Sequence, residues 1–273
     1  MANNVSTFKQ KVNDVDFYCE LRGSGPTIVL VPSGEGDCGS FDKVAEMLAD
    51  EFTVFTFDMR GMSRSGRPKK WTQITNQMLA SDVAGLIKAR NLGPATIYGC
   101  SSGGQCALTI GLNYPEVARN LMVHEASLML DSPLPEQIVA AFLGMVKTVT
   151  KLTGSKNVAS SLIWKILAGD EKSWSLLGAD YHERINKNGD VWIDLMMGPS
   201  ENMTYTAEQL QKMPPLVFSV GVLGQTWLAL ANMAVAQRAK AEVVHLLAAH
   251  YPQVTNPVQL AQHIRKYAKK YLK

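Results

Sequence analysis

Short apolar segments alternate with helical patterns along most of this chain, and this alternation constrains its fold more than any other feature. Apolar runs typical of buried strands occur at 27–31, 52–57, 95–98, 118–123, 216–220 and 242–247. Apolar residues at helical spacing follow several of them, at 41–48, 77–90, 102–114 and after Asn256-Pro257. Strands that alternate with helices of this length predict an α/β fold, with a mostly parallel central sheet flanked by helices.

A further β-rich segment precedes the first of these strands. Residues 15–22 and 27–31 flank the turn Gly23-Ser24-Gly25-Pro26, which predicts a β-hairpin. Ser40 stands just before the helical pattern of 41–48, and we expect it to cap that helix.

The alternation stops between about residues 128 and 208. This stretch is rich in helix-forming residues and contains Trp164, Trp174 and Trp192, with no evident strand. The strand–helix pattern returns after Pro214-Pro215. The sequence therefore predicts a discontinuous core, made of residues 1–127 and 209–273, with an inserted helical cap at 128–208 that covers the active site.

Composition narrows the class of protein. Of the 273 residues, 46% are hydrophobic, enough for a sizeable core, and a formal net charge of +3 gives no reason to expect a nucleic-acid partner. No apolar run approaches the ~20 residues of a membrane helix, and the polar start lacks the core of a signal peptide, so we expect a cytoplasmic protein. The four cysteines show no metal-ligand spacing and are expected to be reduced thiols: Cys19, Cys38, Cys100 and Cys106.

A glycine-rich segment after the first buried strand matches the pattern of a dinucleotide-binding loop. It reads Gly34-Glu35-Gly36-Asp37-Cys38-Gly39, and Asp58 ends the next strand about 20 residues later. However, Glu35 and Asp37 would place two carboxylates where such a loop holds a pyrophosphate, and they would repel it. We therefore do not interpret this segment as a nucleotide site.

Gly99-Cys100-Ser101-Ser102-Gly103 fits the G-x-S-x-G pattern with Ser101 at its centre. It lies between an expected strand and an expected helix, where a sharp turn exposes the serine hydroxyl at the edge of the sheet. This placement predicts Ser101 as a nucleophile. The backbone N–H of Ser102, at the start of the helix, is a natural donor to an oxyanion.

Five histidines are candidates for the general base. His250 follows the last strand, in a loop that can bring its imidazole over the nucleophile, and we predict that it is the base. His245 lies in an apolar strand and is expected in the core, whereas His182 and His263 are expected to be solvated or structural. His124 is expected to support a catalytic neighbour.

A serine nucleophile and a histidine base usually work with a third residue, a carboxylate that orients the histidine. In this chain no carboxylate stands at the usual place for it in an α/β-hydrolase, after the strand that follows the insertion. The stretch after strand 216–220 reads Gly221-Val222-Leu223-Gly224-Gln225 and contains no carboxylate. Glu125, at the end of strand 118–123, can reach the same histidine, so the predicted order along the chain is Ser101, Glu125, His250. The alternative is that Glu125 merely caps the start of the insertion.

These residues make the chain similar to α/β-hydrolases, as does 58–65, which resembles their D-x-R-G-x-G-x-S loop with Ser63 where a glycine is usual. Within that superfamily it resembles the fungal zearalenone hydrolases, lactonases that open a resorcylic macrolactone. The matching segments lie at 31–38, 57–65, 99–103 and 124–125, and within 184–192 and 246–252.

The resemblance implies several roles. Gly34 and Ser102 would donate backbone N–H groups to the oxyanion, and Trp192, in the cap, would touch the substrate. Asp131 matches a carboxylate at the hinge of the cap and is counted with the substrate-binding residues. Ser33, where an aspartate is expected, and Tyr251, where a phenylalanine is usual, are departures that bear on the choice of lactone.

The predicted function is thus a serine hydrolase that opens the lactone ester of a resorcylic macrolactone such as zearalenone, with no cofactor and no metal. The expected partner is a small apolar lactone rather than a nucleic acid or a membrane, and a homodimer is possible. Three alternatives stay open: a general carboxylesterase or perhydrolase, a lactonase for another bulky apolar ester, and a hydrolase-derived ligand receptor.

Overall fold

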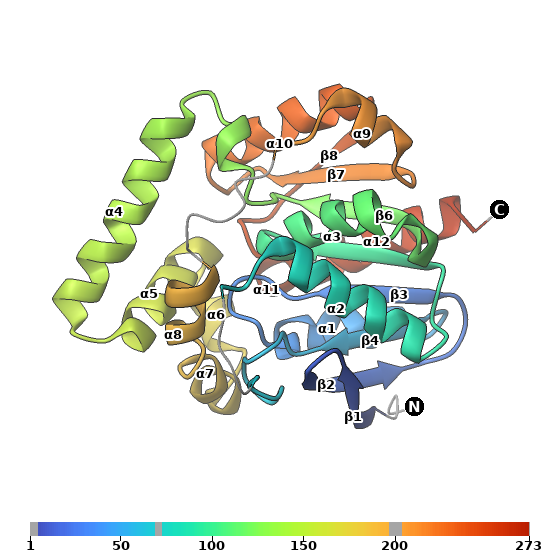
Figure 1. Cartoon of the computed structure of the whole chain (residues 1–273), viewed down its shortest axis with the longest axis horizontal. Helices are drawn as coiled ribbons and strands as arrows, with labels where there is room; N and C mark the ends of the chain where they lie inside the picture. The colour runs from blue at the N-terminus through green and yellow to red at the C-terminus, as the bar shows by residue number, and fades with distance from the viewer. Residues whose placement is uncertain (1–4, 69–72, 197–203, 273) are drawn as a thin grey trace.

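The computed structural model describes residues 5–68, 73–196 and 204–272. Within these residues an eight-stranded sheet has the strand order β1-β2-β4-β3-β5-β6-β7-β8 (Figure 1). The strands are β1 Ser6–Val12, β2 Val15–Arg22, β3 Thr27–Val31, β4 Thr53–Phe57, β5 Ala95–Cys100, β6 Ala118–His124, β7 Leu216–Gly221 and β8 Glu242–Leu246. The pairs β1–β2 and β2–β4 are antiparallel, and all the others are parallel. The predicted α/β fold is confirmed.

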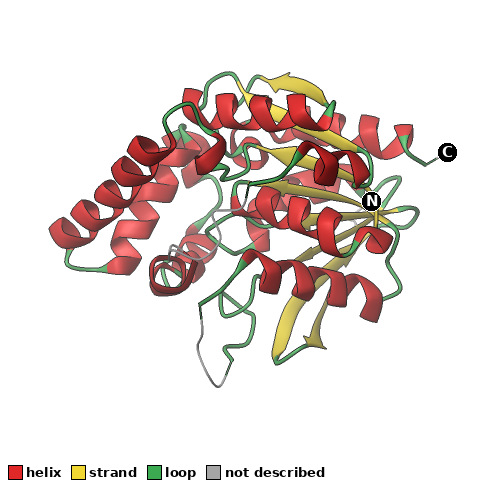
Figure 2. Cartoon of the chain, turned by 45° about the horizontal axis from the view of Figure 1, so that its top comes forward, coloured by secondary structure: helices red, strands yellow, loops and turns green. Residues whose placement is uncertain are grey.

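Helices lie on both faces of this sheet (Figure 2). Those of the core are α1 Asp42–Leu48, α2 Asn76–Ala89, α3 Ser102–Asn113, α9 Ala207–Lys212, α10 Thr226–Ala239, α11 Pro252–Thr255 and α12 Pro257–Lys270. α1 packs beside α12, α2 beside α3, and α10 against β7 and α9. The apolar faces that the sequence predicts for α1, α2 and α12 are buried: Phe41, Val44, Ala45, Leu48, Leu79, Val83, Leu86, Ile87, Leu260, Ile264 and Tyr267.

Three local predictions are wrong. Residues 15–31 do not form a hairpin, because β4 lies between β2 and β3 and β2 pairs with β1 instead. Ser40 does not cap α1, because a 3₁₀ turn, Cys38–Phe41, precedes that helix and Asp37 caps the turn by accepting the N–H of Gly39. His245 is exposed rather than buried, because β8 is the last strand of the sheet.

The chain between β6 and β7 is helical. It contains the 3₁₀ turn Met129–Asp131, α4 Pro135–Thr153, α5 Lys156–Ala168, α6 Glu171–Ser175, α7 Ala179–Ile185, α8 Gly189–Val191 and a π-helical turn, Trp192–Met196. These helices gather at one end of the sheet, with α4 outermost (Figure 1). α5 buries Ile163 and Trp164, whereas Val146 is the one buried residue of α4 among those described. The insertion is therefore packed more firmly near the sheet than at its rim.

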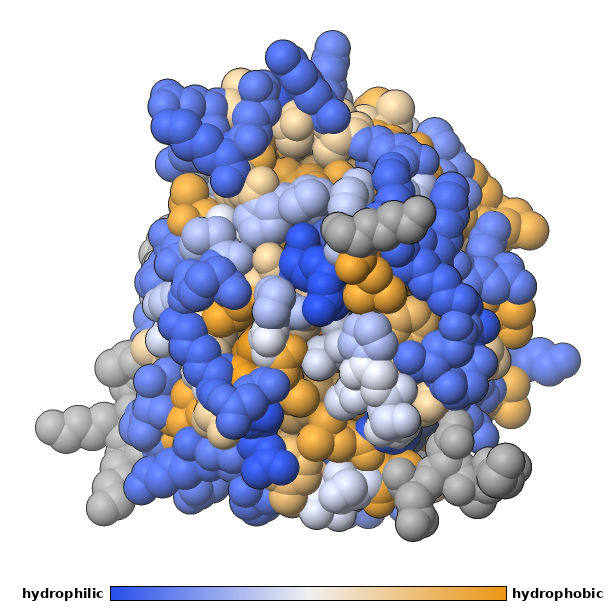
Figure 3. All heavy atoms as spheres, turned by 90° about the vertical axis from the view of Figure 1, so that its right-hand side faces the viewer, coloured by the Kyte–Doolittle hydropathy of each residue, from blue (hydrophilic) through white to orange (hydrophobic). Residues whose placement is uncertain are grey.

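The face at the right-hand side of Figure 1 is covered mostly by hydrophilic side chains, with smaller hydrophobic areas between them (Figure 3). The basic residues at the end of α12 are matched by acidic neighbours. Arg265 pairs with Asp50 and Glu51, Lys269 also pairs with Glu51, and Lys270 with Glu242. The positive charge of this segment is therefore partly neutralised within the molecule. In the part of the chain that the structure describes, no helix has both the length and the apolar character needed to cross a membrane.

Candidate active site

Ser101 stands in the tight turn between β5 and α3. Its backbone dihedrals, φ 57° and ψ −123°, are strained for a residue other than glycine. A Cβ on Gly99 would overlap the carbonyl of Gly103, and a Cβ on Gly103 would lie 2.5 Å from the carbonyl oxygen of Pro32. Both flanking glycines are therefore required by close backbone contacts, as in a nucleophile elbow.

His250 follows β8 and is buried beside Glu125, which leaves the end of β6. The Nδ1 atom of His250 lies 2.9 Å from Oε2 of Glu125. The other carboxylate oxygen, Oε1, accepts a hydrogen bond of 2.8 Å from the backbone N–H of Gly221, at the end of β7. Because both oxygens have a partner, the carboxylate is fixed in orientation. It can hold His250 with Nδ1 protonated, which leaves Nε2 as the proton acceptor.

The electrostatic surroundings favour an ionised Glu125. Burial acts to raise the pKa of this carboxyl, but the hydrogen bonds from His250 and from the backbone N–H of Gly221 act in the opposite direction and outweigh burial, so its pKa lies below the ordinary value. Burial lowers the pKa of the adjacent His124 to about 4, so that side chain is neutral at pH 7. Its Nδ1 lies 2.9 Å from Oγ of Ser219 on β7. His124 thus supports the strand ends without adding charge.

The hydroxyl of Ser101 has a different partner from the one that catalysis requires. Among the described residues, the structure joins Ser101 Oγ to Oγ of Ser127, at 3.1 Å, and not to the ring of His250. The two chain segments are nevertheless close, because the Sγ of Cys100, next to Ser101, donates to the backbone carbonyl of His250 over 3.1 Å. Catalytic hydrogen bonds are often long or misaligned before a substrate binds.

The predicted oxyanion donors lie on two segments in close contact. Gly34 belongs to the loop after β3, and Ser102 is the first residue of α3, where a backbone N–H has no partner within the helix. The close approach of Gly103 to Pro32 brings these segments together. An oxygen between them would face N–H groups and the positive end of a helix dipole.

Trp192 and Tyr251 lie next to this region. A Cβ on Gly34 would lie 2.7 Å from Nε1 of Trp192, so the indole of the inserted segment reaches the loop of the predicted oxyanion donors. The ring of Trp192 is buried against Trp164, with centroids 5.4 Å apart. The Tyr251 ring centroid lies 5.0 Å from that of His250, and its other neighbour is Trp174.

The two other predicted substrate contacts have distinct surroundings. Ser33 is fully buried after β3, and its hydroxyl lies beside the Cys100 thiol and the Tyr251 hydroxyl. Asp131 forms an ion pair with Arg238 on α10, which ties the start of the insertion to the core. Contact of either residue with a substrate stays a prediction.

Comparison with known proteins identifies the family. A sequence model described as "alpha/beta hydrolase fold" matches residues 26–211. The chain belongs to the α/β-hydrolase family. It is similar to a zearalenone hydrolase from Bionectria ochroleuca, with 33% identity over 95% of this chain and 96% of the relative. A zearalenone hydrolase from Cladophialophora bantiana is 31% identical, over 94% of both chains.

Solved structures agree on the fold of this hydrolase. An esterase from Thermogutta terrifontis superposes with a TM-score of 0.77 at 20% identity, covering 98% of this chain and all of the other. An aryl esterase described as putative, from Burkholderia cenocepacia, gives a TM-score of 0.79 at 15% identity, with 98% and 99% covered. The family and its full-length relatives make this chain an ester-hydrolysing enzyme, as predicted.

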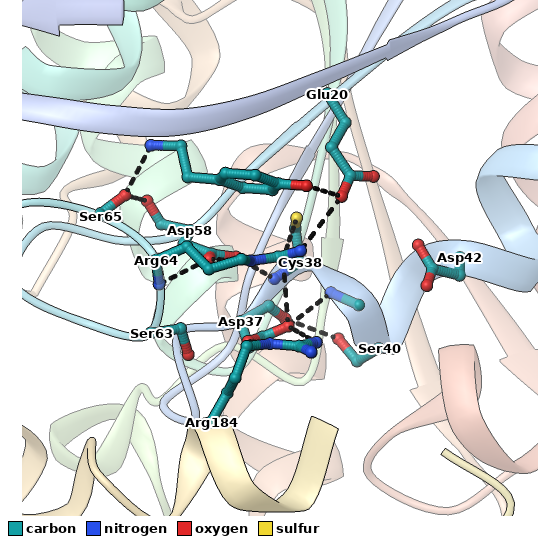
Figure 4. Close-up of polar contacts among 12 residues, drawn as sticks. Glu20, Asp37, Cys38, Ser40, Asp42, Asp58, Ser63, Arg64, Ser65 and Arg184 are labelled. Atoms are coloured by element: carbon teal, nitrogen blue, oxygen red, sulfur yellow. Dashed lines mark hydrogen bonds and ion pairs between the residues drawn. The ribbon is translucent and has the colours of Figure 1, made fainter. Parts of the chain in front are cut away.

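A charged network that sequence reasoning missed fastens the inserted segment of the hydrolase to its core (Figure 4). Arg184 on α7 donates to both carboxylate oxygens of Asp37, at 2.7 and 3.0 Å. Arg64 makes similar contacts with Asp58, whose Oδ1 also accepts the backbone N–H of Cys38. Asp37, one of the two acids in the glycine-rich loop, therefore binds arginines of the same chain, which agrees with our rejection of a nucleotide site. The acids in this loop were visible in the sequence, but Arg184 lies 147 residues further along the chain, so no local pattern pointed to it.

An amide completes this attachment. Asn188 donates to the carbonyl of Glu35 at 2.7 Å and to Oγ of Ser63 at 2.8 Å, and it accepts the N–H of Ser63. Ser63, which replaces the usual glycine, keeps a positive φ of 48° and supplies a hydroxyl to the inserted segment. The departure thus adds a contact that glycine cannot make.

Glu35 is fully buried in the same loop. Burial raises the pKa of its carboxyl to about 7, although Ser40 donates to one of its oxygens over 3.1 Å. Its other oxygen lacks a partner among the described residues. In the same part of the chain all four cysteines are free thiols, and no group of three or more His, Cys, Asp or Glu side chains is arranged to hold a metal ion.

Proposed function

We propose that this hydrolase opens the ester of a bulky apolar lactone, of the resorcylic macrolactone class that includes zearalenone, through Ser101, His250 and Glu125. The observation that carries the proposal is the buried pair of His250 and Glu125, at 2.9 Å, beside a strained serine turn. The full-length relatives, both named zearalenone hydrolases, support the choice of substrate class.

In the proposed first step, Ser101 Oγ attacks the lactone carbonyl carbon and His250 Nε2 takes the hydroxyl proton. Glu125 stabilises the imidazolium that results. The backbone N–H groups of Gly34 and Ser102 bind the oxyanion, and losing one such donor typically costs about 10²–10³-fold in rate. The intermediate then collapses, the ring C–O bond breaks, and the alcohol leaves with the proton from His250.

In the second step, a water molecule gives a proton to His250 and attacks the acyl carbon. The bond to Ser101 Oγ breaks, the serine regains its proton, and the hydroxy acid is released. Trp192 fits a role in positioning the substrate, because its indole N–H can bond a lactone oxygen while its ring packs on an aromatic ligand. The helices α4 to α8 of the inserted segment are proposed to cover the site and limit the access of water.

The decisive experiment is product analysis after incubation of the purified protein with zearalenone, with Ser101→Ala as the control. The ring-opened hydroxy acid should form over many turnovers with the wild type and not with the variant. Bound but unchanged lactone would favour a ligand receptor. Rapid cleavage of short p-nitrophenyl esters, with zearalenone untouched, would favour a general carboxylesterase.

A further inference from the structure

Ser127 carries an unassigned hydroxyl at the nucleophile. It follows the end of β6 by three residues, and its Oγ lies 3.1 Å from Oγ of Ser101. Its backbone N–H also donates to the carbonyl of Ser101 over 3.3 Å. Both residues are partly exposed, whereas the residues that flank Ser127, Ala126 and Leu128, are buried. The serine hydroxyl thus faces the reactive group from a buried part of the chain.

The position of Ser127 is held from the core. The backbone N–H of Ala126 donates to Oδ1 of Asn232 on α10, and Nδ2 of Asn232 donates to the carbonyl of Ala126, both at 2.9 Å. Asn232 is fully buried and also donates to the carbonyl of Leu228, one turn earlier in its helix. Because the Asn232 amide is hydrogen-bonded to both the N–H and the carbonyl of Ala126, it fixes the backbone just before Ser127. The Ser127 hydroxyl is therefore held near Ser101 by a fixed backbone before any substrate binds.

In the proposed reaction, negative charge develops on Ser101 Oγ twice, once as it attacks and once as it leaves. A hydrogen bond from the Ser127 hydroxyl can stabilise that charge. Ser101 has one hydroxyl proton, which must go to His250, so a hydrogen bond from Ser127 must use a lone pair of Ser101 Oγ. During release of the acid, the bond from the acyl carbon to Ser101 Oγ breaks and its electron pair stays on Oγ. That oxygen carries negative charge until the proton arrives from His250, and a donor at hydrogen-bond distance stabilises it.

We propose that Ser127 is a further catalytic residue, which donates its hydroxyl to Ser101 Oγ as the acyl-enzyme breaks down. This inference rests on the proposed function, because it needs Ser101 to be the nucleophile. Ser127 transfers no proton and forms no covalent bond; it stabilises the serine as a leaving group. The same contact aids the attacking Ser101 in the first step to a smaller degree, because there the lone pair of Oγ is consumed in bonding to carbon.

The test compares Ser127→Ala with Ser132→Ala, a control that removes a serine hydroxyl bonded to the carbonyl of Met129 in the same connection. With zearalenone as the substrate, Ser127→Ala should lower kcat by roughly 10- to 100-fold, the usual size of a lost hydrogen bond to a charged group. The value of kcat/KM, which reports acylation, should fall less. Intact-protein mass after an acid quench should show the acylated form accumulating in Ser127→Ala and not in the control.

A second pair of variants separates the effect of the hydroxyl at position 127 from the effect of side-chain size. Ser127→Thr keeps a hydroxyl and Ser127→Val is its isostere without one, so Ser127→Thr should turn over at least ten-fold faster than Ser127→Val. Equal rates in this pair, a higher kcat in Ser127→Ala, or a rise in KM alone would overturn the inference. Activity that survives in Ser101→Ala would instead overturn the proposed function. If Ser101→Ala is inactive and Ser127→Ala behaves as the wild type, only the role of Ser127 fails.

Discussion

The ends of β6 and β7 lie side by side in the sheet, and they contribute to the site in opposite ways. His124 on β6 is in register with Ser219 on β7, and Glu125 follows directly. β7 instead ends at Gly221, and the turn that follows it, as far as Gly224, contains no carboxylate side chain. One strand end thus provides the carboxylate of Glu125, and the other provides a backbone N–H and the space that this carboxylate occupies.

This difference explains how the carboxylate of Glu125 reaches His250 from the end of β6. The Gly221 N–H fixes one oxygen of Glu125, and a Cβ on Gly224 would lie only 3.1 Å from that same oxygen. Glu125 itself has a positive φ of 39°, an uncommon conformation for a glutamate, so the turn after β6 is constrained to aim it at His250. The position of the Glu125 carboxylate therefore depends on both strand ends.

The largest effect should follow from removing the charge at the end of β6. Glu125→Gln keeps the shape of the side chain and an oxygen for the Gly221 N–H, but it no longer fixes the protonated Nδ1 of His250. We expect kcat to fall by roughly 10³–10⁴-fold. The check is a rate measurement alongside thermal unfolding, which should show a folded protein. Near-normal turnover in a folded variant would leave Glu125 as a structural cap.

Transferring the acid from one strand end to the other sharpens the comparison. In Glu125→Ala with Gly224→Asp, a carboxylate from the β7 side should enter the space that Glu125 vacates. Gly224 has no positive φ, so an aspartate can adopt its backbone. We expect the double variant to be at least ten-fold faster than Glu125→Ala alone. No recovery, with a normal melting temperature, would mean that only the β6 geometry can orient His250.

A smaller effect is expected from crowding the acid without removing it. Gly224→Ala places a methyl group 3.1 Å from Glu125 Oε1, closer than ordinary van der Waals contact, and should lower kcat by about three- to ten-fold through a shift of the carboxylate. Gly144→Ala, on α4, is the matched control, because a Cβ there meets nothing within 4 Å. The control should keep its activity. Equal kcat values for the two variants would show that the space beside Glu125 is not constrained.

Much of the fold could be predicted from the sequence alone. Uninterrupted apolar runs predicted the buried strands well, and the positions of Ser101, Glu125 and His250 at strand ends followed from that pattern. The edge strand β1 was missed because its exposed, polar residues alternate without a strong apolar signal. The order of β2, β4 and β3 depends on pairing between distant segments.

The contacts that shape the site were harder to foresee for the same reason. Arg184 and Asp37 are separated by 147 residues, and Ser101 and Ser127 meet only because β5 and β6 are neighbours in the sheet. Side-chain partners of this kind leave no local pattern in a sequence.

The smallest expected change concerns stability rather than turnover. The folded protein keeps His124, with a pKa of about 4, neutral, whereas the unfolded chain protonates it below pH 6.5. At this side chain the unfolded state binds more protons between pH 6.5 and 4, so the contribution of His124 to the free energy of unfolding should fall as the pH is lowered through this range, whereas buried Glu35, with a pKa of about 7, acts in the opposite direction. Protonation of His124 in the unfolded chain alone lowers the free energy of unfolding by roughly 3 kcal/mol at pH 4 relative to neutral pH. Urea unfolding at several pH values should show that the free energy of unfolding of the wild type falls relative to that of His124→Gln as the pH is lowered from 6.5 to 4. A difference between the two proteins that stays constant over this range would contradict this account.

The central claim is that Ser101 attacks the substrate while Glu125, from β6, orients His250. It is tested most directly by peptide mass mapping after an acid quench of the protein with zearalenone, using Ser127→Ala or Glu125→Gln to slow turnover. The account predicts an added mass equal to that of the intact lactone, located on Ser101 rather than on the adjacent Cys100 by fragmentation of the peptide that contains both. This adduct should disappear as the hydroxy acid is released. Ring-opened product that forms with no adduct on that peptide, or an adduct on Cys100 instead, would contradict it.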